Sequence, residues 1–528
     1  MHPFSRESSH SNGPTLNVPE HSEGPAVKPV KDVDEASLAP RLSSSTILPD
    51  SDGLDDPLSR QFSQPVHPTQ DCSSSDVEKQ PEYIKPLYVE FEIGDRRNPI
   101  NFSRRRKWAI TVLSSFSTLL AASTAAGYNL GFDSMTRDLN CTRFQATIGL
   151  STYTLGFGIV PIFTAAFSEE FGRQPLYIVS AGGFFIMYIM VALAKNIQTV
   201  IIARFLQGSF SSTWTTMVGG TIADIWVPEE RGLPMTIFTV AAIGGTGVGP
   251  MMAGWIEMNQ RLEWKWIQWI QMMICGIYIA LFPLIMKETR SSILLTRLAK
   301  KIRKETGDDR YRARVEDERT SLGTLIFISI TRPIVLMVTE PVVASFSVWI
   351  GFCWGVVYAL VESIPFIFRD LHNFNDGLLG TAFAVMVVGS LLGYLSNILQ
   401  ESLYRKNFPH RGPEARLYMA CAGAVMLPAG MFIYAWTSFT FVPIFMWAIF
   451  IIFLAVFTYL ADTYVPFISM AFPLFTTQMY GKLGYTWAST LFACIAAVMI
   501  PAPFVLFFYG PSIRRRSKFS SMVMNSEQ

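Results

Sequence analysis

The stretch RRRKWAITVLSSFSTLLAASTAAGYNL, residues 104–130, decides the fold. Four basic residues come first, and the run that follows them, 108–130, contains no Asp, Glu, Lys or Arg. An α-helix needs about 20 predominantly apolar residues to cross the hydrocarbon core of a bilayer. Because Lys and Arg beside a span stay on the cytoplasmic side, the stretch predicts a membrane-spanning helix that starts in the cytoplasm.

Apolar stretches of similar length recur along the rest of the chain. Soluble helices cannot be apolar on all sides in such a succession, so the predicted fold class is an all-α polytopic membrane protein. We expect twelve spans, near residues 108–130, 144–167, 175–194, 199–223, 234–256, 266–286, 334–360, 378–399, 417–436, 443–462, 463–481 and 487–509.

The distribution of Lys and Arg gives the orientation of these spans. Basic clusters precede the first span, lie between the sixth and seventh spans, and follow the last one. Both termini and the middle segment are therefore predicted to be cytoplasmic, with six spans on either side. The composition of the N-terminal tail is typical of disorder. The expected parts are a disordered cytoplasmic tail (1–97), an N-terminal six-helix half (98–286), a cytoplasmic middle loop (287–332), a C-terminal six-helix half (333–511) and a cytoplasmic C-terminal tail (512–528).

The composition excludes several other classes of protein. Only 16% of the residues are charged and 50% are hydrophobic, whereas soluble domains carry about 25% charged residues. The net charge of +2 gives no basic footprint for a nucleic acid. The six cysteines lack CxxC spacing and none of the six histidines lies in an apolar stretch. We therefore expect no metal, no other cofactor and no enzyme activity.

Ionisable residues inside the spans are candidates for transport chemistry, because a charge in the membrane is costly unless it faces a partner or a cavity. Arg204 and Gln207 lie in the fourth span. The alternative is an arginine that binds neighbouring helix carbonyls and only fixes packing. No span contains histidine, so any group that binds and releases a proton inside the membrane would have to be a carboxylate. Glu340, expected near the cytoplasmic third of the seventh span, either carries the proton or pairs structurally, whereas Glu362 lies near a span end and is expected to be solvated.

Two short loops between predicted spans carry charges of both signs. Glu169 lies four residues before Arg173, and Gly172 between them permits a tight turn. Asp224 and Arg231 lie in a similar loop between the fourth and fifth spans. We expect ion pairs in both loops, with Asp224 as an ion-pair partner.

The fifth span is rich in glycine and contains a proline. Gly245, Gly249 and Gly254 remove side-chain bulk, and Pro250 removes one helix hydrogen bond. This composition predicts either close contact with another helix or a bend that governs alternating access. The two interpretations are compatible. The glycine spacing superficially matches a phosphate-binding loop, but it has no preceding strand and no lysine, so nucleotide binding is rejected.

Taken together, these motifs resemble those of a known family. The Gly172–Arg173 loop, Arg204-x-x-Gln207-Gly208 and Gly249-Pro250-x-x-Ala253-Gly254 are similar to the loop, proton-coupling and antiporter motifs of twelve-span drug:proton antiporters in the major facilitator superfamily. The resemblance covers about residues 95–518 and implies two six-helix halves, a gating role for the two charged loops, and export of small organic compounds driven by proton entry. Further matches indicate the fungal branch: Asn98-Pro99-x-Asn101-Phe102-Ser103, Glu288-Thr289-Arg290, Glu340-Pro341 and Phe472-Pro473-Leu474-Phe475.

The sequence departs from the family pattern in two places. In the first loop, Ala165 replaces the usual leading glycine and Gln174 replaces a usual basic residue. The region 443–481 is unusually short for two crossings, which need about 40 residues before any turn. We favour two short spans that turn tightly around Asp462. A gene-model error or a genuine internal loss is the competing account, and either would put transport itself in doubt.

Aromatic residues in the inner parts of the spans are candidates for lining a substrate cavity, although most aromatics on membrane helices pack or face lipid. A cavity of this kind would suit amphipathic or planar substrates. The candidate residues are Tyr153, Trp214, Trp354, Tyr358 and Tyr459.

The favoured function is proton-coupled efflux of drugs, fungal secondary metabolites or toxins, or polyamines, by alternating access. The expected partners are the small-molecule substrate, protons and the lipid bilayer, with no nucleic acid, and the protein is expected to be a monomer. We expect the plasma membrane, with the vacuolar membrane as the alternative. Asn140 begins an N-glycosylation sequon in the first external loop. The competing functions are an uptake carrier for a small nutrient and a non-transporting sensor.

Overall fold

The computed structural model describes residues 86–92, 94–317, 321–411, 415, 417–436 and 471–516. Each of the first six expected spans coincides closely with a helix of the first half. The elements are η2 (Pro99–Asn101), α1 (Arg104–Gly127), η3 (Tyr128–Gly131), α2 (Phe132–Asp138), α3 (Arg143–Phe171), α4 (Arg173–Ala192), α5 (Ile197–Ile225), η4 (Pro228–Glu230), α6 (Gly232–Glu257) and α7 (Glu263–Ile285).

The second half is described in part. Gly484, with φ of 75°, breaks α16 into two helices that meet at a turn. The predicted span 443–462, much of 463–481 and the residues Tyr459 and Asp462 lie outside the described residues. The elements are α10 (Leu322–Thr339), α11 (Pro341–His372), α12 (Asp376–Ala382), α13 (Ala384–Arg411), α14 (Tyr418–Trp436), α16 (Ala471–Val498) and α17 (Pro501–Arg516).

Within the described residues, nine helices are long and apolar enough to cross a membrane. Helix α5 is not one of these nine, because Arg204, Gln207 and its many Ser and Thr residues lower its hydropathy. It nevertheless packs against α3, α4 and α1, in the interior of the first half. Arg204, Gln207 and most of its Ser and Thr residues are therefore buried within the protein.

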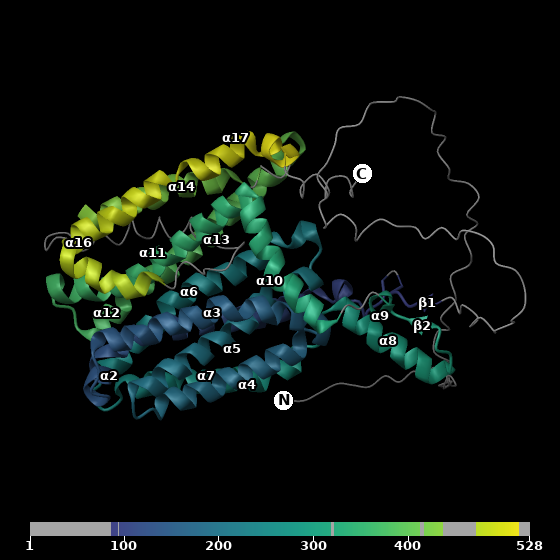
Figure 1. Ribbon diagram of the computed structural model, residues 1–528, viewed down its shortest axis with the longest axis horizontal. Helices are drawn as coiled ribbons and strands as arrows, with labels where there is room; N and C mark the ends of the chain where they lie inside the picture. Colours follow the sequence, from purple (N-terminus) through teal and green to yellow (C-terminus); the bar gives the residue numbers. More distant parts are fainter. Residues whose placement is uncertain are drawn as a thin grey trace, which may run out of the picture. The chain divides into compact units, whose positions relative to one another are not determined.

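The seventh span begins later than the sequence analysis expects. Helix α10 ends at Thr339, α11 begins at Pro341, and the candidate span runs from Val343 to His372, whereas the expected span is 334–360. Proline lacks an N–H group and disfavours a helical residue before it, so it ends one helix and starts the next. Figure 1 shows α10 running across the direction of α11 at this junction.

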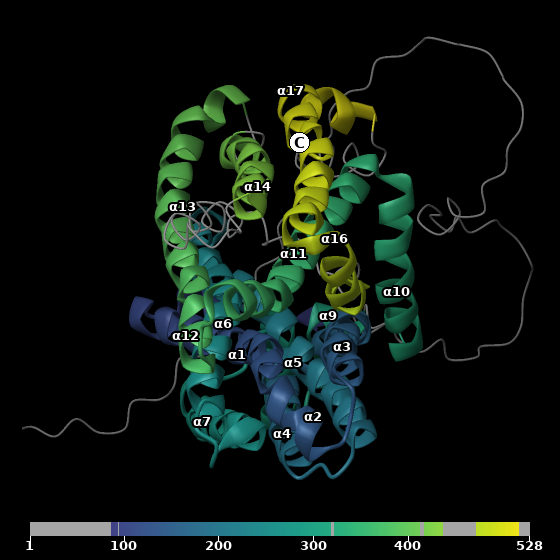
Figure 2. The ribbon, with the colours of Figure 1, turned by 90° about the vertical axis from the view of Figure 1, so that its left-hand side faces the viewer.

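Helix α6 joins the two halves. Figure 2 shows α13, α14 and α16 on one side of α6, and α4 and α7 on the other. A Cβ atom on Gly254 would lie 2.3 Å from the backbone oxygen of Asp376, which begins α12, and one on Gly249 would lie 2.2 Å from the backbone oxygen of Ser123 in α1. The predicted close packing of the glycine-rich span is therefore observed, and α6 stays helical through Pro250.

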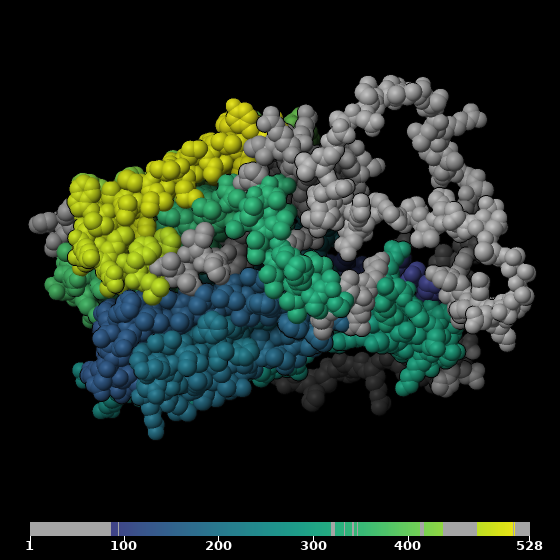
Figure 3. Space-filling model, viewed as in Figure 1, coloured from purple at the N-terminus to yellow at the C-terminus, as the bar shows by residue number. Residues whose placement is uncertain are grey.

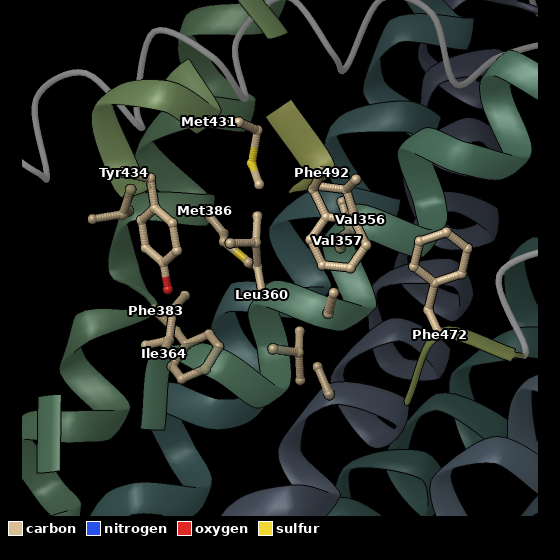
Figure 4. Packing of buried hydrophobic residues seen from close by; sticks show 14 of the residues in the cluster. Val356, Val357, Leu360, Ile364, Phe383, Met386, Met431, Tyr434, Phe472 and Phe492 are labelled. Atoms are coloured by element: carbon tan, nitrogen blue, oxygen red, sulfur yellow. The ribbon is translucent and has the colours of Figure 1, made fainter. Parts of the chain in front are cut away.

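Two large hydrophobic clusters stabilise the halves, and they meet at α11. The cluster of the second half includes Ile243 and Ala253 of α6. Figure 4 shows Leu360 and Ile364 of α11 among the buried side chains of this cluster. In Figure 3 the yellow C-terminal helices lie along one side of the molecule and the blue helices of the first half along the other.

A small substructure occupies part of the segments expected to be the cytoplasmic tail and middle loop. Strand β1 (Leu87–Tyr88) pairs in parallel with β2 (Tyr311–Arg312), next to α8 (Ser291–Thr306) and α9 (Arg314–Asp317). The expectation of disorder up to residue 97 is therefore wrong for residues 86–92 and 94–97, while the residues before Pro86 lie outside the described part. Strands of two residues leave no alternating pattern that a sequence could reveal.

Candidate functional site

Arg204 is the centre of a buried polar cluster in the first half. Its side chain is 0% exposed. Nη1 donates to the backbone oxygen of Thr124 at 3.2 Å and to Oε1 of Gln207 at 2.9 Å. Because α5 places Gln207 one turn after Arg204, the spacing seen in the sequence becomes a direct contact.

Two tyrosine rings also hold the Arg204 guanidinium. Its carbon lies 4.2 Å from the ring centre of Tyr128 and 4.4 Å from that of Tyr153, distances typical of cation–π contacts. The Tyr153 hydroxyl donates to the backbone oxygen of Ala121 at 2.9 Å, which fixes the ring. Tyr153 was expected to line a cavity, and the structure places it against the arginine.

The Arg204 guanidinium retains unused hydrogen-bonding capacity. Within the described residues, no carboxylate forms an ion pair with it, and Nε and Nη2 have no hydrogen-bond partner. A buried donor without a partner is unfavourable. The site can therefore bind an acceptor group of a ligand, such as a carbonyl, carboxylate or phenolic oxygen.

Two aromatic residues of α11 reach the same region from the second half. Tyr358 is buried and packs with Trp354 against the hydrophobic cluster of the first half. Tyr358 is also close enough to Arg204 to interact with it electrostatically. Trp214 instead lies within that cluster, with its ring centre 4.8 Å from that of Phe184. Of the four aromatic candidates within the described residues, Tyr153 and Tyr358 therefore gather at Arg204.

Glu362 was expected to be solvated, and the structure shows that this is wrong. Its side chain is 4% exposed, in the middle of the buried part of α11. Oε2 accepts a hydrogen bond from the Thr477 hydroxyl at 3.0 Å, and within the described residues Oε1 has no partner. The later start of the seventh span moves Glu362 from the expected span end to the interior. The spacing of Trp354, Tyr358 and Glu362 at i, i+4 and i+8 was the signal in the sequence.

Glu340 lies outside the span in which it was expected. It occupies the junction between α10 and α11, before the candidate span that starts at Val343, and it is half-buried. The expected position in the cytoplasmic third of the seventh span is therefore wrong. Its role in proton coupling stays a prediction.

The first of the two loops predicted to gate is built around a tight turn. Gly172 has a φ of 91°, and a Cβ atom there would lie 2.4 Å from Oε2 of Glu288. Arg173 forms an ion pair with Asp224, with Nε 2.5 Å from Oδ2, so the two predicted loops contact each other. The expectation that Asp224 is an ion-pair partner is confirmed.

Glu288 completes this network, and its contacts are absent from the sequence-based predictions. It is 4% exposed, and its carboxylate accepts hydrogen bonds from the backbone N–H groups of Arg173 at 3.1 Å and Gln174 at 3.3 Å. These are the free donors at the N-terminus of α4, where the helix dipole favours a negative charge. The only signal in the sequence was an acidic residue directly after the sixth span.

Glu169 and Arg231, the other residues predicted to gate, contact different partners. Oε1 of Glu169 lies 3.7 Å from Nη2 of Arg290, and within the described residues the ion pair of Arg173 is with Asp224 and not with Glu169 as expected from the sequence. Arg231 donates to the backbone oxygens of Trp226 at 2.9 Å and Ala223 at 2.7 Å. Arg231 therefore caps the C-terminal end of α5.

Ion pairs connect the two halves at the predicted outer end. Asp133 of α2 pairs with Arg143 of α3 at 3.2 Å and with Arg369 of α11. Arg369 also pairs with Asp376 of α12 at 2.5 Å. Asn140, in the loop between α2 and α3, is exposed with a φ of 49°. Its glycosylation stays a prediction.

Comparison with known proteins gives one consistent family. Residues 113–466 match the model of the Major Facilitator Superfamily. The chain is 32% identical over 485 residues to the multidrug transporter FLR2 of Candida glabrata, covering 85% of this chain and 82% of that protein. It is 30% identical over 490 residues to the citrinin biosynthesis cluster MFS transporter mrr1 of Monascus ruber, covering 85% of this chain and 97% of that protein.

Solved structures support the fold. The proton:xylose symporter XylE bound to 6-bromo-6-deoxy-D-glucose matches with a TM-score of 0.55 at 12% identity, covering 77% of this chain and 96% of that chain. This likeness concerns the fold alone. Together with the matching family model, it confirms the predicted fold class and the family that the motifs resemble. Among the described residues, no group of His, Cys, Asp and Glu could hold a metal ion.

Proposed function

The chain belongs to the major facilitator superfamily, and we propose that it exports small organic compounds in exchange for protons by alternating access. The observation that carries this proposal is the Arg204 site. A buried guanidinium with two unused donors lies between the rings of Tyr128 and Tyr153, close to Tyr358 of the second half. Such a site is suited to a ligand that enters between the halves.

The chemistry of this site favours one class of substrate. Stacked aromatic rings bind planar apolar groups, and the free donors of Arg204 bind oxygen acceptors. Planar or aromatic compounds with oxygen acceptors, among them drugs and fungal secondary metabolites or toxins, therefore fit better than polyamines, whose positive charges would meet the guanidinium. Two relatives are named a multidrug transporter and a citrinin biosynthesis cluster transporter, and these names support this class of substrate.

The contacts between the halves suggest how access alternates. At the outer end, the Asp133–Arg369 ion pair closes the gap between α2 and α11. At the cytoplasmic end, Glu288 and the Arg173–Asp224 pair tie α4, α5 and α7 into one body within the first half. We propose that the halves rock around α6 and that the outer pairs open while the cytoplasmic body moves as a unit. The protein acts in the plasma membrane under this proposal.

The experiment is accumulation of citrinin in proteoliposomes with an acidic interior. The proposal predicts that citrinin accumulates inside while the gradient lasts, and that a protonophore abolishes the accumulation. Protein-free liposomes with the same gradient account for passive partition. Citrinin accumulation with an alkaline interior would indicate an uptake carrier. No protein-dependent movement of citrinin, or of a panel of planar aromatic drugs, would favour a non-transporting sensor.

A further inference from the structure

One face of α11 is directed at the first half of the protein. Trp354, Tyr358, Glu362 and Phe366 are spaced by four residues, so they lie along one side of the helix. Trp354 and Tyr358 pack against the hydrophobic cluster of the first half. Phe366 lies beneath the guanidinium of Arg143, with its ring centre 4.8 Å from the guanidinium carbon. Glu362, between Tyr358 and Phe366, therefore lies on the side of α11 that meets the other half.

Glu362 has little compensation for a negative charge. Its one hydrogen bond within the described residues comes from the Thr477 hydroxyl of α16 at 3.0 Å, and Oε1 is buried without a partner. Arg143 of α3 acts on it electrostatically, but Arg143 already pairs with Asp133 and stacks on Phe366. A buried carboxylate without an ion pair is unfavourable in its charged form. Protonation of the Glu362 carboxylate removes that cost. Water or a new hydrogen-bond donor at Oε1 would stabilise the charged form again.

The residues beside Glu362 connect it to the Arg204 site. The backbone oxygen of Val361 accepts a hydrogen bond from Nδ2 of Asn129 at 2.6 Å, across the boundary between the halves. Asn129 directly follows Tyr128, whose ring stacks on the Arg204 guanidinium. A movement of one half against the other must therefore change the surroundings of both Glu362 and Arg204.

The ionisable groups on the elements packed around this part of α11 are few. They are Arg143 on α3, Tyr128 on η3, Tyr434 on α14 and Tyr480 on α16 within the described residues. Tyr434 pairs with the Ser363 hydroxyl at 3.0 Å, and Tyr480 pairs with Ser489 at 2.9 Å. None of these four groups is a carboxylate, so Glu362 supplies the carboxylate of this set.

We propose that Glu362 is the group that binds and releases the proton exchanged for the exported compound, an inference that rests on the proposed function. When the outer side is open, the Glu362 carboxylate binds one proton and becomes a neutral carboxylic acid. The neutral group is tolerated as the halves close around it. When the cytoplasmic side opens, water reaches Oε1, and the proton leaves into the cytoplasm. No bond other than O–H forms or breaks in this cycle.

The test compares Glu362→Gln with the control Glu305→Gln in the full-length protein, and Glu340→Gln is measured as the rival carboxylate. Glu305 is an exposed residue of α8 that pairs with Lys301. Glutamine keeps an oxygen acceptor for Thr477 but cannot bind a proton reversibly. In proteoliposomes, citrinin movement is measured in two modes: accumulation driven by an acidic interior, and exchange of labelled for unlabelled citrinin without a gradient. We expect Glu362→Gln to lose gradient-driven accumulation, down to the level of protein-free liposomes, and to retain exchange. Glu305→Gln is expected to retain both. Glu362→Asp, which can still bind a proton, is expected to retain part of the gradient-driven accumulation.

A second readout does not depend on a substrate. Infrared difference spectra of the purified protein, recorded across a pH step, report the carbonyl stretch of protonated carboxyl groups. The wild-type protein is expected to show a band that Glu362→Gln lacks and Glu305→Gln retains. If wild-type protein moves no citrinin, the proposed function fails, and the infrared band still decides whether Glu362 binds a proton.

Three results would overturn the inference. The first is gradient-driven accumulation at the wild-type level by Glu362→Gln. The second is loss of accumulation in Glu340→Gln with retention in Glu362→Gln, which would assign the proton to the α10–α11 junction. The third is a carboxyl band that persists unchanged in Glu362→Gln. Should Glu362→Gln fail to fold, wild-type coupling in Glu362→Asp with an unshifted carboxyl band would equally contradict the assignment.

Discussion

Arg204 is held by stacking and by hydrogen bonds that a lysine cannot reproduce. An ammonium group keeps the charge but lacks the planar fork that binds Gln207, stacks on two rings and leaves two donors free. A hydrogen bond to a charged group is worth about 1.5–3 kcal/mol. We therefore expect Arg204→Lys to lower the initial rate of citrinin accumulation about tenfold, as measured in proteoliposomes with an acidic interior.

Arg137→Lys is the matched control for this substitution. Arg137 forms an exposed ion pair with Glu263, and exposed pairs contribute only about 0–1 kcal/mol. Accumulation by Arg137→Lys is expected at the wild-type rate. A wild-type rate in Arg204→Lys would show that the planar fork has no part in binding or transport.

Gly172 is a residue whose backbone excludes a side chain. Its φ of 91° is strained for other residues, and a Cβ atom would stand 2.4 Å from Oε2 of Glu288. We expect Gly172→Ala to lower the free energy of unfolding by about 1–3 kcal/mol, because both the turn and the cap on α4 are disturbed. The melting temperature in detergent measures the effect.

Gly182→Ala in α4 provides the comparison. Within the described residues, no atom lies within 4 Å of a Cβ placed there. Alanine inside a helix is expected to be neutral or to stabilise by about 0.5–1 kcal/mol. Equal melting temperatures for Gly172→Ala and Gly182→Ala would contradict the described geometry of the turn.

The sequence predicted a functional residue where its residue type and its position in a span were informative by themselves. Arg204 stood out because an arginine inside a span is rare, and its contact with Gln207 follows from one helical turn. The contacts of Glu288 and Glu362 were not predictable, since their partners come from residues more than 100 positions away in α4 and α16. Glu340 was misplaced because the helix break before Pro341 went unrecognised.

Helix α6 packs on its neighbours through backbone contacts that glycine alone allows. At Gly254, a Cβ atom would lie 2.3 Å from the backbone oxygen of Asp376, across the boundary between the halves. We expect Gly254→Ala to push α12 away from α6 at the outer end, which lowers both the melting temperature and the rate of citrinin accumulation.

The control is Gly219→Ala, on α5. A Cβ atom there would lie 3.7 Å from Cε of Met235, an ordinary van der Waals distance. Gly219→Ala is expected to behave as the wild type in both measurements. A Gly254→Ala protein with unchanged stability and transport would mean that the contact between α6 and α12 tolerates widening.

Elements were predictable where hydropathy and charge decided them. The spans of the first half coincide with α1 and α3–α7 because long apolar stretches have few alternatives to crossing the membrane. The β1–β2 pair was missed, because two residues on each strand give no periodic signal. The predicted start of the seventh span is too early, because α10 is also apolar and apolar character alone does not separate α10 from α11.

The whole molecule is expected to have both termini in the cytoplasm. The region 443–481 is short for two crossings, and residues 437–470 lie outside the described part. A C-terminal epitope tag behind a protease site tests the topology in sealed right-side-out vesicles. We expect cleavage only after the vesicles are permeabilised, because the basic residues at 514–516 favour the cytoplasmic side.

A second tag in the loop next to Asn140 serves as the control and should be cut without permeabilisation. Cleavage of the C-terminal tag from outside would remove one span from the second half. That outcome would favour the non-transporting sensor over the exporter. Hydropathy predicts the number of spans where each apolar stretch has the length of one crossing. The region 443–481 is too long for one crossing and short for two, so hydropathy alone does not give its number of spans.

The central claim is that export of a small organic compound and entry of a proton are the same event. The most direct measurement records both movements at once, in proteoliposomes that contain a trapped pH indicator and receive labelled citrinin outside. With an acidic interior, the account predicts that citrinin enters and protons leave together, and that Glu362→Gln stops the proton movement caused by citrinin. Citrinin and protons moving in the same direction, or citrinin moving without any proton, would contradict it.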